Sequence, residues 1–336
     1  MPTRRATIKD VAEAAAVSRS TASRALTGNG YVAAGVRLRV EEVARAMGYV
    51  PNAAAQHLRR RQTSSLGLLV SDLTNSFYAE LAAGATQQAR RRGYTVMLTD
   101  DAATGEDGTT PAQAFVQLRV AGVIATPTTA GTGAYLREHR IPVVEVDRQF
   151  AEGASDAVVV DNAAGAHRVT AQLIEEGHRR IALFIDETLW TTGRDRYAGY
   201  RRALADAHLP LDPDLVVSAG WDVGAARLTA ARMLAGPGRP TAVFAANNLL
   251  AEGVWRAAAD LALDVPRDLS LVSFDDAPWM SMVTPGITAV AQDVLALGRT
   301  AVDVLLDRLA EPDAPVRTVV VPAHVVERGS VAPPAG

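Results

Sequence analysis

The sequence predicts two fold classes in one chain: a small all-α head, and an α/β body of two lobes whose parallel sheets are doubly wound. Three observations support this. Two short helical patterns flank a tight turn near the start, strand-like apolar runs alternate with helical patterns from residue 65 onward, and the charge is divided unevenly between the two parts.

The composition is that of a globular protein with more than one domain. The chain has 336 residues, of which 48% are hydrophobic and 21% are charged. Residues 1–61 hold eleven Lys or Arg against four Asp or Glu, so this part carries +7 and the net charge of -3 leaves -10 on the rest. A basic head suits contact with a polyanion such as DNA, although a chance surface cluster would give the same count.

Neither export nor membrane insertion is indicated. Cysteine is absent, which excludes disulfides and thiolate metal sites and is compatible with a reducing compartment. Arg4 and Arg5 are not followed by an apolar run of signal-peptide length, and no stretch reaches the roughly 18 apolar residues of a membrane span. We therefore expect a cytoplasmic protein with no membrane partner.

The first helix is predicted to begin after Thr7. The Thr-x-x-Asp pair of Thr7 and Asp10 forms a variant of the capping box, in which each residue satisfies a backbone amide of the other. Helical spacing then places one apolar face inward, made of Ile8, Val11, Ala12 and Ala15.

The second helix carries the polar face that a DNA-reading helix needs. Ser18 is the expected N-cap, and Ala22, Ala25 and Leu26 form the inner face. The outward side chains suit base edges and phosphates, although an ordinary solvated helix face is the alternative; they are Arg19, Ser20, Ser23 and Arg24.

A third helix and a short basic segment follow. Apolar residues repeat at helical spacing up to Met47, and Gly48 is the expected left-handed stop. Pro51 and the alanine-rich run to Arg61 predict a helix too short to be stable alone, which would order only against a partner or DNA. Leu58 beside three arginines suggests a minor-groove wedge, and a plain basic linker is the alternative.

The body alternates strands and helices. Helical patterns run from Phe77 to Arg91 and from Gly165 to Glu176, each ending at a glycine. About 275 residues of this pattern exceed one sheet, so we expect two lobes. The apolar strand-like runs are 66–70, 96–99, 123–126, 143–146, 158–160, 181–185, 242–245 and 269–274.

Polar residues directly follow these strands, where parallel sheets bind ligands. With the aromatic residues Phe77 and Tyr78 they suit a sugar or a nucleoside, and for each the alternative is a capping or turn role. They are Ser71, Asp72, Asp147, Arg148, Arg194, Arg196, Asn247, Asn248, Asp275 and Asp276.

Catalytic and cofactor signatures are missing. Gly131-x-Gly133 is followed by Leu136 where a dinucleotide fingerprint needs its third glycine, and Lys9 is the only lysine, so there is no P-loop. No Gly-x-Ser-x-Gly elbow occurs, and the six histidines lack metal-ligand spacing. We therefore expect no enzyme activity, no cofactor and no metal.

The head resembles that of the lactose-repressor (LacI/GalR) family of bacterial transcription regulators. The resemblance lies in Thr-Ile-Lys-Asp-Val-Ala (7–12), Val-Ser-Arg-Ser-Thr-Ala-Ser-Arg (17–24) and Gly-Tyr-Val-Pro-Asn (48–52), with a hinge ending at Leu58. It implies base reading by Arg19, Ser20 and Arg24, and backbone contacts by Thr7, Ser18, Thr21, Ser23, Tyr31 and Arg37. It further implies hinge contacts in the minor groove by Asn52, Ala55 and Leu58.

The head departs from the family pattern at three positions. Ala33 and Val36 stand where the family has a Ser or Thr cap and a nearby Thr at the third helix, and Thr27 stands where Asn is common. Loss of a cap costs about 1 kcal/mol, so the start of this helix is expected to fray.

The resemblance extends over the body through Gly67-Leu68-Leu69-Val70, Glu176-Gly177-His178, 196–200 and Ser273-Phe274-Asp275-Asp276. It implies a body similar to periplasmic sugar-binding proteins, with three chain crossings and an effector between the lobes. The implied effector contacts are Asp72, Phe77, Asp147, Arg148, Arg196, Trp221, Asn247, Asp275 and Gln292, while Asn248 replaces a usual Asp.

The implied domains are a helix-turn-helix domain (1–50), a hinge helix and linker (51–64), and two lobes. The N-terminal lobe takes 65–161 and 292–321, and the C-terminal lobe takes 162–291 and 322–336. Residues after Val326 hold no leucine heptads, which indicates a dimer rather than a tetramer.

The resulting hypothesis is a homodimeric repressor that binds palindromic double-stranded DNA under control of a small-molecule effector, a sugar or nucleoside. The effector would either lower or raise operator affinity. Two alternatives are a transport-type solute-binding protein, which would need an export signal and no head, and a Rossmann-type oxidoreductase, which would need the missing glycine fingerprint.

Overall fold

The computed structural model describes residues 6–28, 30–49, 63–100, 110–127, 129–150, 153–186 and 190–335. The chain divides into two compact units, residues 1–63 and 64–336. Among the described residues, no helix has both the length and the apolar character needed to cross a membrane.

The head consists of three helices, α1 (Ile8–Ala14), α2 (Arg19–Thr27) and α3 (Ala34–Ala46). The predicted capping box is confirmed: Thr7 Oγ1 accepts from the Asp10 amide, and the Asp10 carboxylate accepts from the Thr7 amide at 2.7 Å. Ser18 caps α2 as predicted, accepting from the Thr21 amide at 3.1 Å. The two helices therefore begin where their cap residues predict.

The core of the head is small and made mostly of alanine and valine, including Val11, Ala22 and Val40. Helix α3 starts at Ala33 with no side-chain cap, as expected, and Gly48 has the left-handed φ of +60° that was predicted. Met47 lies at helical spacing but is 39% exposed, because it is the C-cap residue, beyond the last full turn.

The first lobe is built on a six-stranded sheet in the order β11-β5-β4-β3-β1-β2, and all its neighbouring pairs are parallel. Because both faces are covered by helices, most strands are continuous apolar runs. The strands are β1 (Ser65–Val70), β2 (Thr95–Asp100), β3 (Val123–Ala125), β4 (Val143–Val146), β5 (Asp156–Val160) and β11 (Thr318–Val321).

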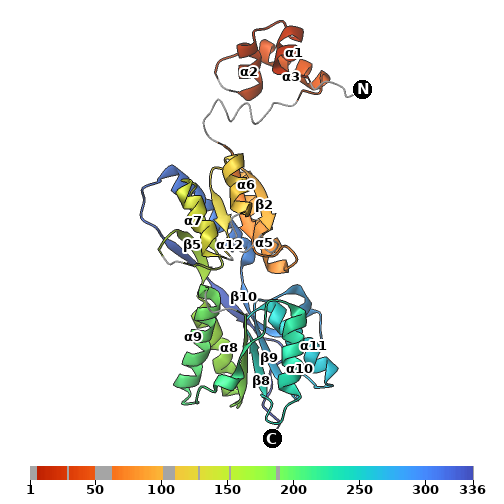
Figure 1. Ribbon diagram of the computed structural model, residues 1–336. Coiled ribbons are helices and arrows are strands. Elements are labelled where there is room, and N and C mark those ends of the chain that lie inside the picture. The colour runs from red at the N-terminus through yellow and green to blue at the C-terminus, as the bar shows by residue number, and fades with distance from the viewer. Residues whose placement is uncertain are drawn as a thin grey trace. The chain divides into compact units, whose positions relative to one another are not determined.

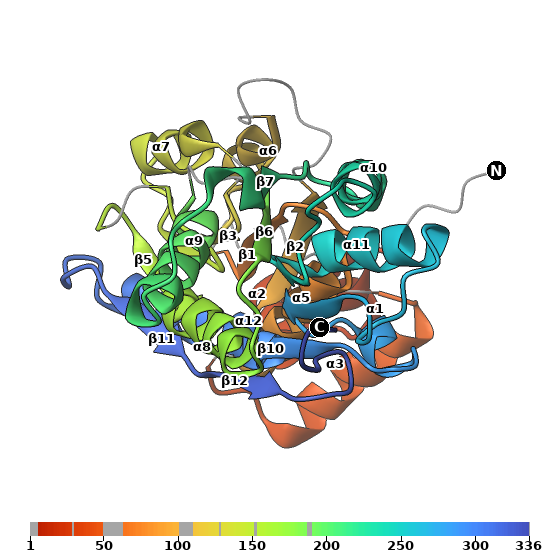
Figure 2. The same cartoon turned by 90° about the horizontal axis from the view of Figure 1, so that it is seen from below.

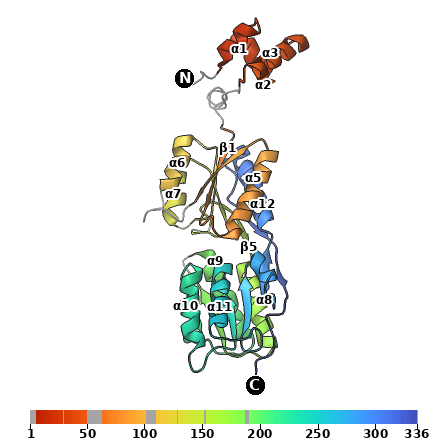
Figure 3. The ribbon, with the colours of Figure 1, turned by 90° about the vertical axis from the view of Figure 1, so that its right-hand side faces the viewer.

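Two pairs of helices cover this sheet. Figure 3 shows α5 (Ser76–Arg91) and α12 (Val294–Ala310) on one face, and α6 (Thr110–Leu118) and α7 (Ala130–Glu138) on the other. Helices α5 and α12 come from opposite ends of the body sequence, so the first lobe is completed only when the chain returns to it.

The second lobe repeats this plan with the strand order β12-β10-β9-β8-β6-β7. Figure 2 shows α8 (Asn162–Glu175) and α9 (Thr191–Asp206) on one side of β6 and β7, and α10 (Val223–Leu234) and α11 (Asn248–Asp260) on the other. The strands are β6 (Ile181–Ile185), β7 (Val216–Ser218), β8 (Ala242–Ala245), β9 (Ser270–Phe274), β10 (Thr288–Gln292) and β12 (Ala323–Val326). Short 3-10 turns occur at Pro213–Leu215 and Pro278–Ser281.

The predicted fold class is confirmed, with one difference. Strand β12 pairs with β10 in the antiparallel sense, whereas doubly wound parallel sheets were expected. The reason is its short connection to the first sheet: β12 follows β11 after a single residue, Pro322, so it continues the direction of β11 into the second sheet instead of entering it from a helix.

The chain passes between the two sheets three times, from β5 to α8, from β10 to α12 and from β11 to β12, and Figure 1 shows the two lobes that these crossings join. Along each order, β1 corresponds to β6, β4 to β9 and β5 to β10. The helix caps after β5 and β10 have nearly the same backbone conformation: φ and ψ are -76° and 83° at Asp161, and -78° and 82° at Asp293.

Paired helices in each lobe approach closely at glycines. A Cβ at Gly84 of α5 would lie 2.3 Å from the Leu295 carbonyl oxygen of α12, and one at Gly199 of α9 would lie 2.2 Å from the Ala163 carbonyl oxygen of α8. Each glycine is eight residues into its helix, and each carbonyl is two residues after the capping aspartate. The two lobes therefore share this close helix contact.

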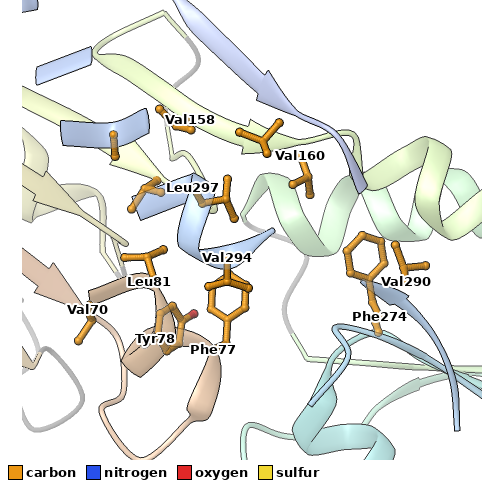
Figure 4. Packing of buried hydrophobic residues seen from close by; sticks show 14 of the residues in the cluster. Val70, Phe77, Tyr78, Leu81, Val158, Val160, Phe274, Val290, Val294 and Leu297 are labelled. Carbon is orange, nitrogen blue, oxygen red and sulfur yellow. The ribbon is translucent and has the colours of Figure 1, made fainter. Parts of the chain in front are cut away.

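One apolar cluster runs through both lobes. Figure 4 shows Phe77 and Tyr78 of α5 and Val294 and Leu297 of α12 in the same cluster as Phe274 and Val290 of the second sheet. Burial of such surface is the main stabilising contribution to folding, so the two lobes share part of their core.

The last residues of the chain belong to the second lobe. Ser330 Oγ donates to the Leu271 carbonyl at 2.6 Å and accepts from the Thr288 amide at 2.8 Å. His178 lies 2.9 Å from Thr241 Oγ1 through Nδ1 and 3.0 Å from the Ala332 carbonyl oxygen through Nε2, and burial lowers its pKa. These contacts hold residues 328–332 along the edge of the lobe.

Candidate functional site

A cavity of about 410 Å³ lies between the two lobes of the body. Both lobes contribute to it, mostly through residues that directly follow strands or begin helices. It is lined by Ser71, Asp72, Asn75, Phe77, Tyr78, Asp147, Arg148, Asp186, Trp190, Thr192, Arg196, Trp221, Asn247, Asn248, Leu249 and Asp275.

Two lining carboxylates occupy equivalent positions. Asp147 follows β4 and Asp275 follows β9, and these strands correspond in the two sheets. Both have a left-handed backbone, with φ of +72° and +69°, which is uncommon for a residue with a side chain. Such strained conformations cluster at functional sites, so the pair is a natural centre for the site.

In the first lobe, Arg148 organises the wall of the cavity. Its Nη2 donates to Ser71 Oγ at 2.6 Å and to the Tyr78 hydroxyl, while its Nε lies 3.6 Å from Asp147 Oδ2. The guanidinium also stacks 4.1 Å from the ring centre of Trp190, which belongs to the second lobe. Its Nε has no hydrogen-bond partner among the described residues.

In the second lobe, Arg196 organises the wall of the cavity in the same way. Its Nε donates to Asn162 Oδ1 at 2.8 Å, and its Nη1 donates to the Ala246 carbonyl at 2.6 Å and lies 3.8 Å from Asp275 Oδ2. The guanidinium packs 3.8 Å from the ring centre of Phe274. Because both arginines are nearly buried, these contacts fix their positions.

Burial makes both central carboxylates weak acids for their type. Desolvation, with a further contribution from Asp147, raises the pKa of Asp275 to about 6, although Arg196 acts in the opposite direction. Desolvation also raises the pKa of Asp147 despite the nearby Arg148 and Arg196, and it raises the pKa of the Tyr78 hydroxyl. Near neutral pH the cavity therefore holds carboxylates that are costly to keep ionised.

Two asparagines bridge the lobes at one side of the cavity. Asn75 caps α5 and Asn248 is the first residue of α11, and their side-chain amides exchange hydrogen bonds at 2.9 and 3.3 Å. Asn247 caps α11 through the Leu250 amide and donates to Asp186 at 3.0 Å. The replacement of the usual Asp by Asn248 thus supplies both a donor and an acceptor.

Aromatic rings form the remaining wall. Trp190 and Trp221 meet edge to face with centroids 4.5 Å apart, and Phe77 and Tyr78 do so at 5.1 Å. Trp221 is 53% exposed and Trp190 is buried. A flat apolar surface next to hydrogen-bonding groups suits a sugar ring or another small polar ring.

Eight of the nine residues predicted to contact an effector line this cavity. The exception, Gln292, lies behind it and donates through Nε2 to Asp275 Oδ1. Of the other residues noted after strands, Asp276 pairs instead with Arg328 at 2.7 Å, and Arg194 does not line the cavity. The contacts themselves stay predictions.

Sequence reasoning missed five lining residues: Asn75, Asp186, Trp190, Thr192 and Leu249. Asp186 follows β6 directly and could have been found by the strand-end rule. Trp190 and Thr192 lie at the start of α9, and Leu249 lies in the first turn of α11, where no polar strand-end signal marks them.

The head presents its predicted reading face to solvent. Arg19, Ser20 and Arg24 are exposed on α2, and Arg24 Nε donates to the Ser20 carbonyl at 3.3 Å. Thr7, Ser18 and the 90% exposed Tyr31 lie at helix starts and in the loop before α3, while Thr21, Ser23 and Arg37 are partly buried. Asn52, Ala55 and Leu58 lie outside the described residues.

No cluster of three or more potential metal ligands occurs within the described parts of the chain. The arginines, carboxylates and amides of the cavity are hydrogen-bonding groups for recognition.

Comparisons with known proteins agree with this division of the chain. Residues 7–52 match the model of bacterial regulatory proteins of the lacI family, and residues 170–331 match that of a periplasmic binding protein-like domain. The ribose operon repressor of Haemophilus influenzae is 31% identical over 330 residues, which cover 97% of this chain and 98% of the relative.

Solved structures give the same answer. The lac repressor dimer bound to operator and an anti-inducer is similar with a TM-score of 0.88 and 26% identity, over 98% of this chain and all of that one. A LacI family transcriptional regulator from Enterococcus faecium with bound ribose is 26% identical with a TM-score of 0.71, over 80% of this chain and 99% of that one. The chain therefore belongs to the lacI family of bacterial regulatory proteins, and it is a DNA-binding transcriptional regulator rather than an enzyme or a transport-type solute-binding protein.

Proposed function

We propose that this protein is a repressor whose head binds a palindromic operator and whose cavity binds a sugar that controls operator affinity. One observation carries the proposal: a helix-turn-helix head and a two-lobed body with a polar cavity between its lobes occur in one chain. A transport protein has no use for the head, and a simple DNA-binding protein has no use for the cavity.

The proposed operator contacts follow from the surface of α2. Arg19, Ser20 and Arg24 would read base edges in the major groove, because they are exposed and start the second helix of the motif. Thr7, Ser18, Thr21, Ser23, Tyr31 and Arg37 would contact the backbone. Asn52, Ala55 and Leu58 would contact the minor groove, with Leu58 as the wedge.

A homodimer on a symmetric operator is part of the proposal. The similar lac repressor structure is a dimer bound to operator, and two-fold symmetry in such a protein requires inverted half-sites in the DNA. Because its DNA target lies in the bacterial cytoplasm, we infer that the protein works there.

A sugar is the proposed effector. The Haemophilus influenzae relative is a repressor of a ribose operon, and the Enterococcus faecium structure holds ribose. The proposed contacts are Asp72, Phe77, Asp147, Arg148, Arg196, Trp221, Asn247 and Asp275, with Gln292 holding Asp275 in place.

The two lobes are proposed to act as the bistable element. Their proposed limits are 65–161 with 292–321 and 162–291 with 322–336, after a domain of 1–50 and a hinge of 51–64. An effector that binds one lobe arrangement better shifts the population toward it, and the shift is limited by the difference in affinity.

The test is a selection of bound duplexes from random DNA by the full chain, followed by titration of the winning sequence with and without sugars. We expect an inverted repeat, and Arg19→Ala should weaken its binding by about 10- to 100-fold, since one good base contact is worth about 1–3 kcal/mol. Glu138→Gln, an exposed change at the end of α7, is the control. Equal affinity for the inverted repeat and random DNA at moderate salt would contradict the proposal.

A further inference from the structure

We propose that the cavity selects an uncharged, polyhydroxylated effector and discriminates against phosphorylated and carboxylated sugars and against nucleobases. The inference rests on the proposed function, because it specifies the ligand of the same cavity. It follows from three features: the charge balance of the lining, the engagement of both arginines, and the acceptor atoms that remain.

The first feature is an excess of negative charge. Among the described residues, four carboxylates line the cavity, those of Asp72, Asp147, Asp186 and Asp275, against the two guanidinium groups of Arg148 and Arg196. With all six ionised the formal charge is therefore -2. A phosphate group would add about -1.5 to -2 at pH 7, in a partly buried site where salt screens poorly.

The second feature is that neither arginine offers a free two-nitrogen edge. Recognition of carboxylate or phosphate by arginine uses two parallel N–H donors. Arg148 uses Nη2 for Ser71 and Tyr78, and both possible forks of its guanidinium include Nη2. Arg196 uses Nε for Asn162 and Nη1 for the Ala246 carbonyl, which occupies one nitrogen of each fork.

The third feature is the set of atoms left for a ligand. Asp147 accepts from Tyr78 on Oδ2, and Asp275 accepts from Gln292 on Oδ1, whereas the second oxygen of each has no hydrogen bond to the described residues. These two oxygens come from opposite lobes. The Arg148 Nε is a buried donor that lies 3.6 Å from Asp147 Oδ2 but has no hydrogen-bond partner among the described residues.

A polyol fits these atoms. Its hydroxyls can donate to carboxylates on both lobes, and one of its oxygens can accept from Arg148, because each hydroxyl is both donor and acceptor. A nucleobase offers only a few ring donors and would leave carboxylate oxygens unpaired, which is costly in a buried site.

Two of the helix starts at the cavity agree with this assignment. An open helix N-terminus attracts anions, but Asn75 caps α5 by accepting from the Phe77 amide, and Asn247 caps α11 by accepting from the Leu250 amide. Helix α9 has no side-chain cap, so its start by itself would favour an anion; the carboxylate of Asp186, which precedes it in the chain, lines the same cavity and opposes a second negative charge there.

The experiment is calorimetric titration of the full chain at pH 7.5 with matched ligands. The neutral set is ribose, glucose, galactose, xylose, arabinose, mannose, fructose, sucrose and cellobiose. The charged set is ribose 5-phosphate, glucose 6-phosphate and glucuronate, and the base set is hypoxanthine and adenine. We expect a neutral sugar to bind, and its charged counterpart to bind about 100-fold more weakly, as one like charge about 6 Å away at an effective dielectric of 20 implies.

A pair of variants tests the cause. Asp147→Asn removes one lining charge and should reduce the discrimination between neutral and phosphorylated sugar by up to about 100-fold, the effect of one like charge at that distance. Asp206→Asn makes the same change at the far end of α9 and should leave the ratio unaltered. Circular dichroism establishes that both variants are folded, and the ratio of affinities cannot be moved by a general loss of active protein.

The inference is overturned if a phosphorylated or carboxylated sugar or a nucleobase binds as tightly as the best neutral sugar, or if no neutral sugar of the panel binds. These failures differ from failure of the proposed function. In the first two cases the protein still selects an inverted repeat from random DNA, whereas a chain without that preference would refute the regulator itself.

Discussion

The two lobes of the body have the same plan but fill it differently. Strands β4 and β9 occupy the same place in their sheets, and each ends in an aspartate with a left-handed backbone. Asp147 is held by Tyr78 and the adjacent Arg148, whereas Asp275 is held by Gln292 and by Arg196 from a helix. The repeated backbone of the two sheets therefore places the two carboxylates at equivalent positions, whereas the different side chains around them determine what each carboxylate can bind.

The largest expected effect concerns the close helix contacts, where the equivalence of the two lobes can be tested by substitution. Gly84→Ala and Gly199→Ala should each lower the free energy of unfolding by about 1–3 kcal/mol, because the new methyl would lie within 2.3 Å of a carbonyl oxygen of the partner helix. Chemical denaturation measures both. If the lobes are equivalent here the two losses agree, and a loss in one variant only would show that their helix packing differs. Ala83→Ser, on the exposed face of α5, is the control.

The next largest effect is the pH dependence of stability that arises from the buried carboxylate of Asp275. The folded-state pKa of Asp275 is about 6, above its usual 3.8, so the folded protein holds this proton more tightly than the unfolded chain. The stability from this group is complete below pH 4 and is lost as the pH rises through 6, by up to about 3 kcal/mol. Thermal denaturation of Asp275→Asn beside the parent, from pH 4 to 7, should show a smaller loss of stability in the variant; Glu145 and Asp147, whose pKa values burial also raises, contribute to the loss in both proteins.

The two carboxylates should also differ in how they affect the pH dependence of effector binding. Hydroxyls that donate to Asp275 favour its ionised form, so effector affinity should fall as the pH drops below about 6, and Asp275→Asn should remove this dependence. Asp147→Asn should retain it, because the titrating group is still present. An affinity of the parent that is independent of pH between 5 and 7 would show that Asp275 does not accept from the effector.

The smallest expected effect is the loss of stability on removing the aspartates that cap α8 and α12. Asp161 accepts from the Ala164 amide and Asp293 from the Ala296 amide, both at 2.8 Å. Asp161→Ala and Asp293→Ala should each cost about 1 kcal/mol of stability. Denaturation midpoints that differ strongly between the two variants would contradict the equivalence of these caps.

Much of this arrangement is readable from local sequence. Capping residues such as Thr7 and Ser18 define helix starts, and apolar runs followed by polar residues define the strands and the cavity edge. Such signals are local, so they can be recognised in the sequence without knowledge of the fold. They were enough for the fold class and for most of the cavity lining.

The remainder depends on contacts between distant segments. Gln292 meets Asp275 only after β10 pairs with β9, and Trp190 meets Arg148 only after the two lobes come together. No local pattern contains that information. Strand β12 was not predicted either, because its orientation is set by the single residue that separates it from β11 and not by its own sequence.

The three chain crossings also bear on when the body can fold during synthesis. The first lobe lacks α12 and β11, and the second lacks β10, β12 and the Ser330 contacts, until residues 288–332 have left the ribosome. Neither lobe can therefore mature on the nascent chain ahead of the other, and the head, whose core needs only residues 8–49, is the part able to form first.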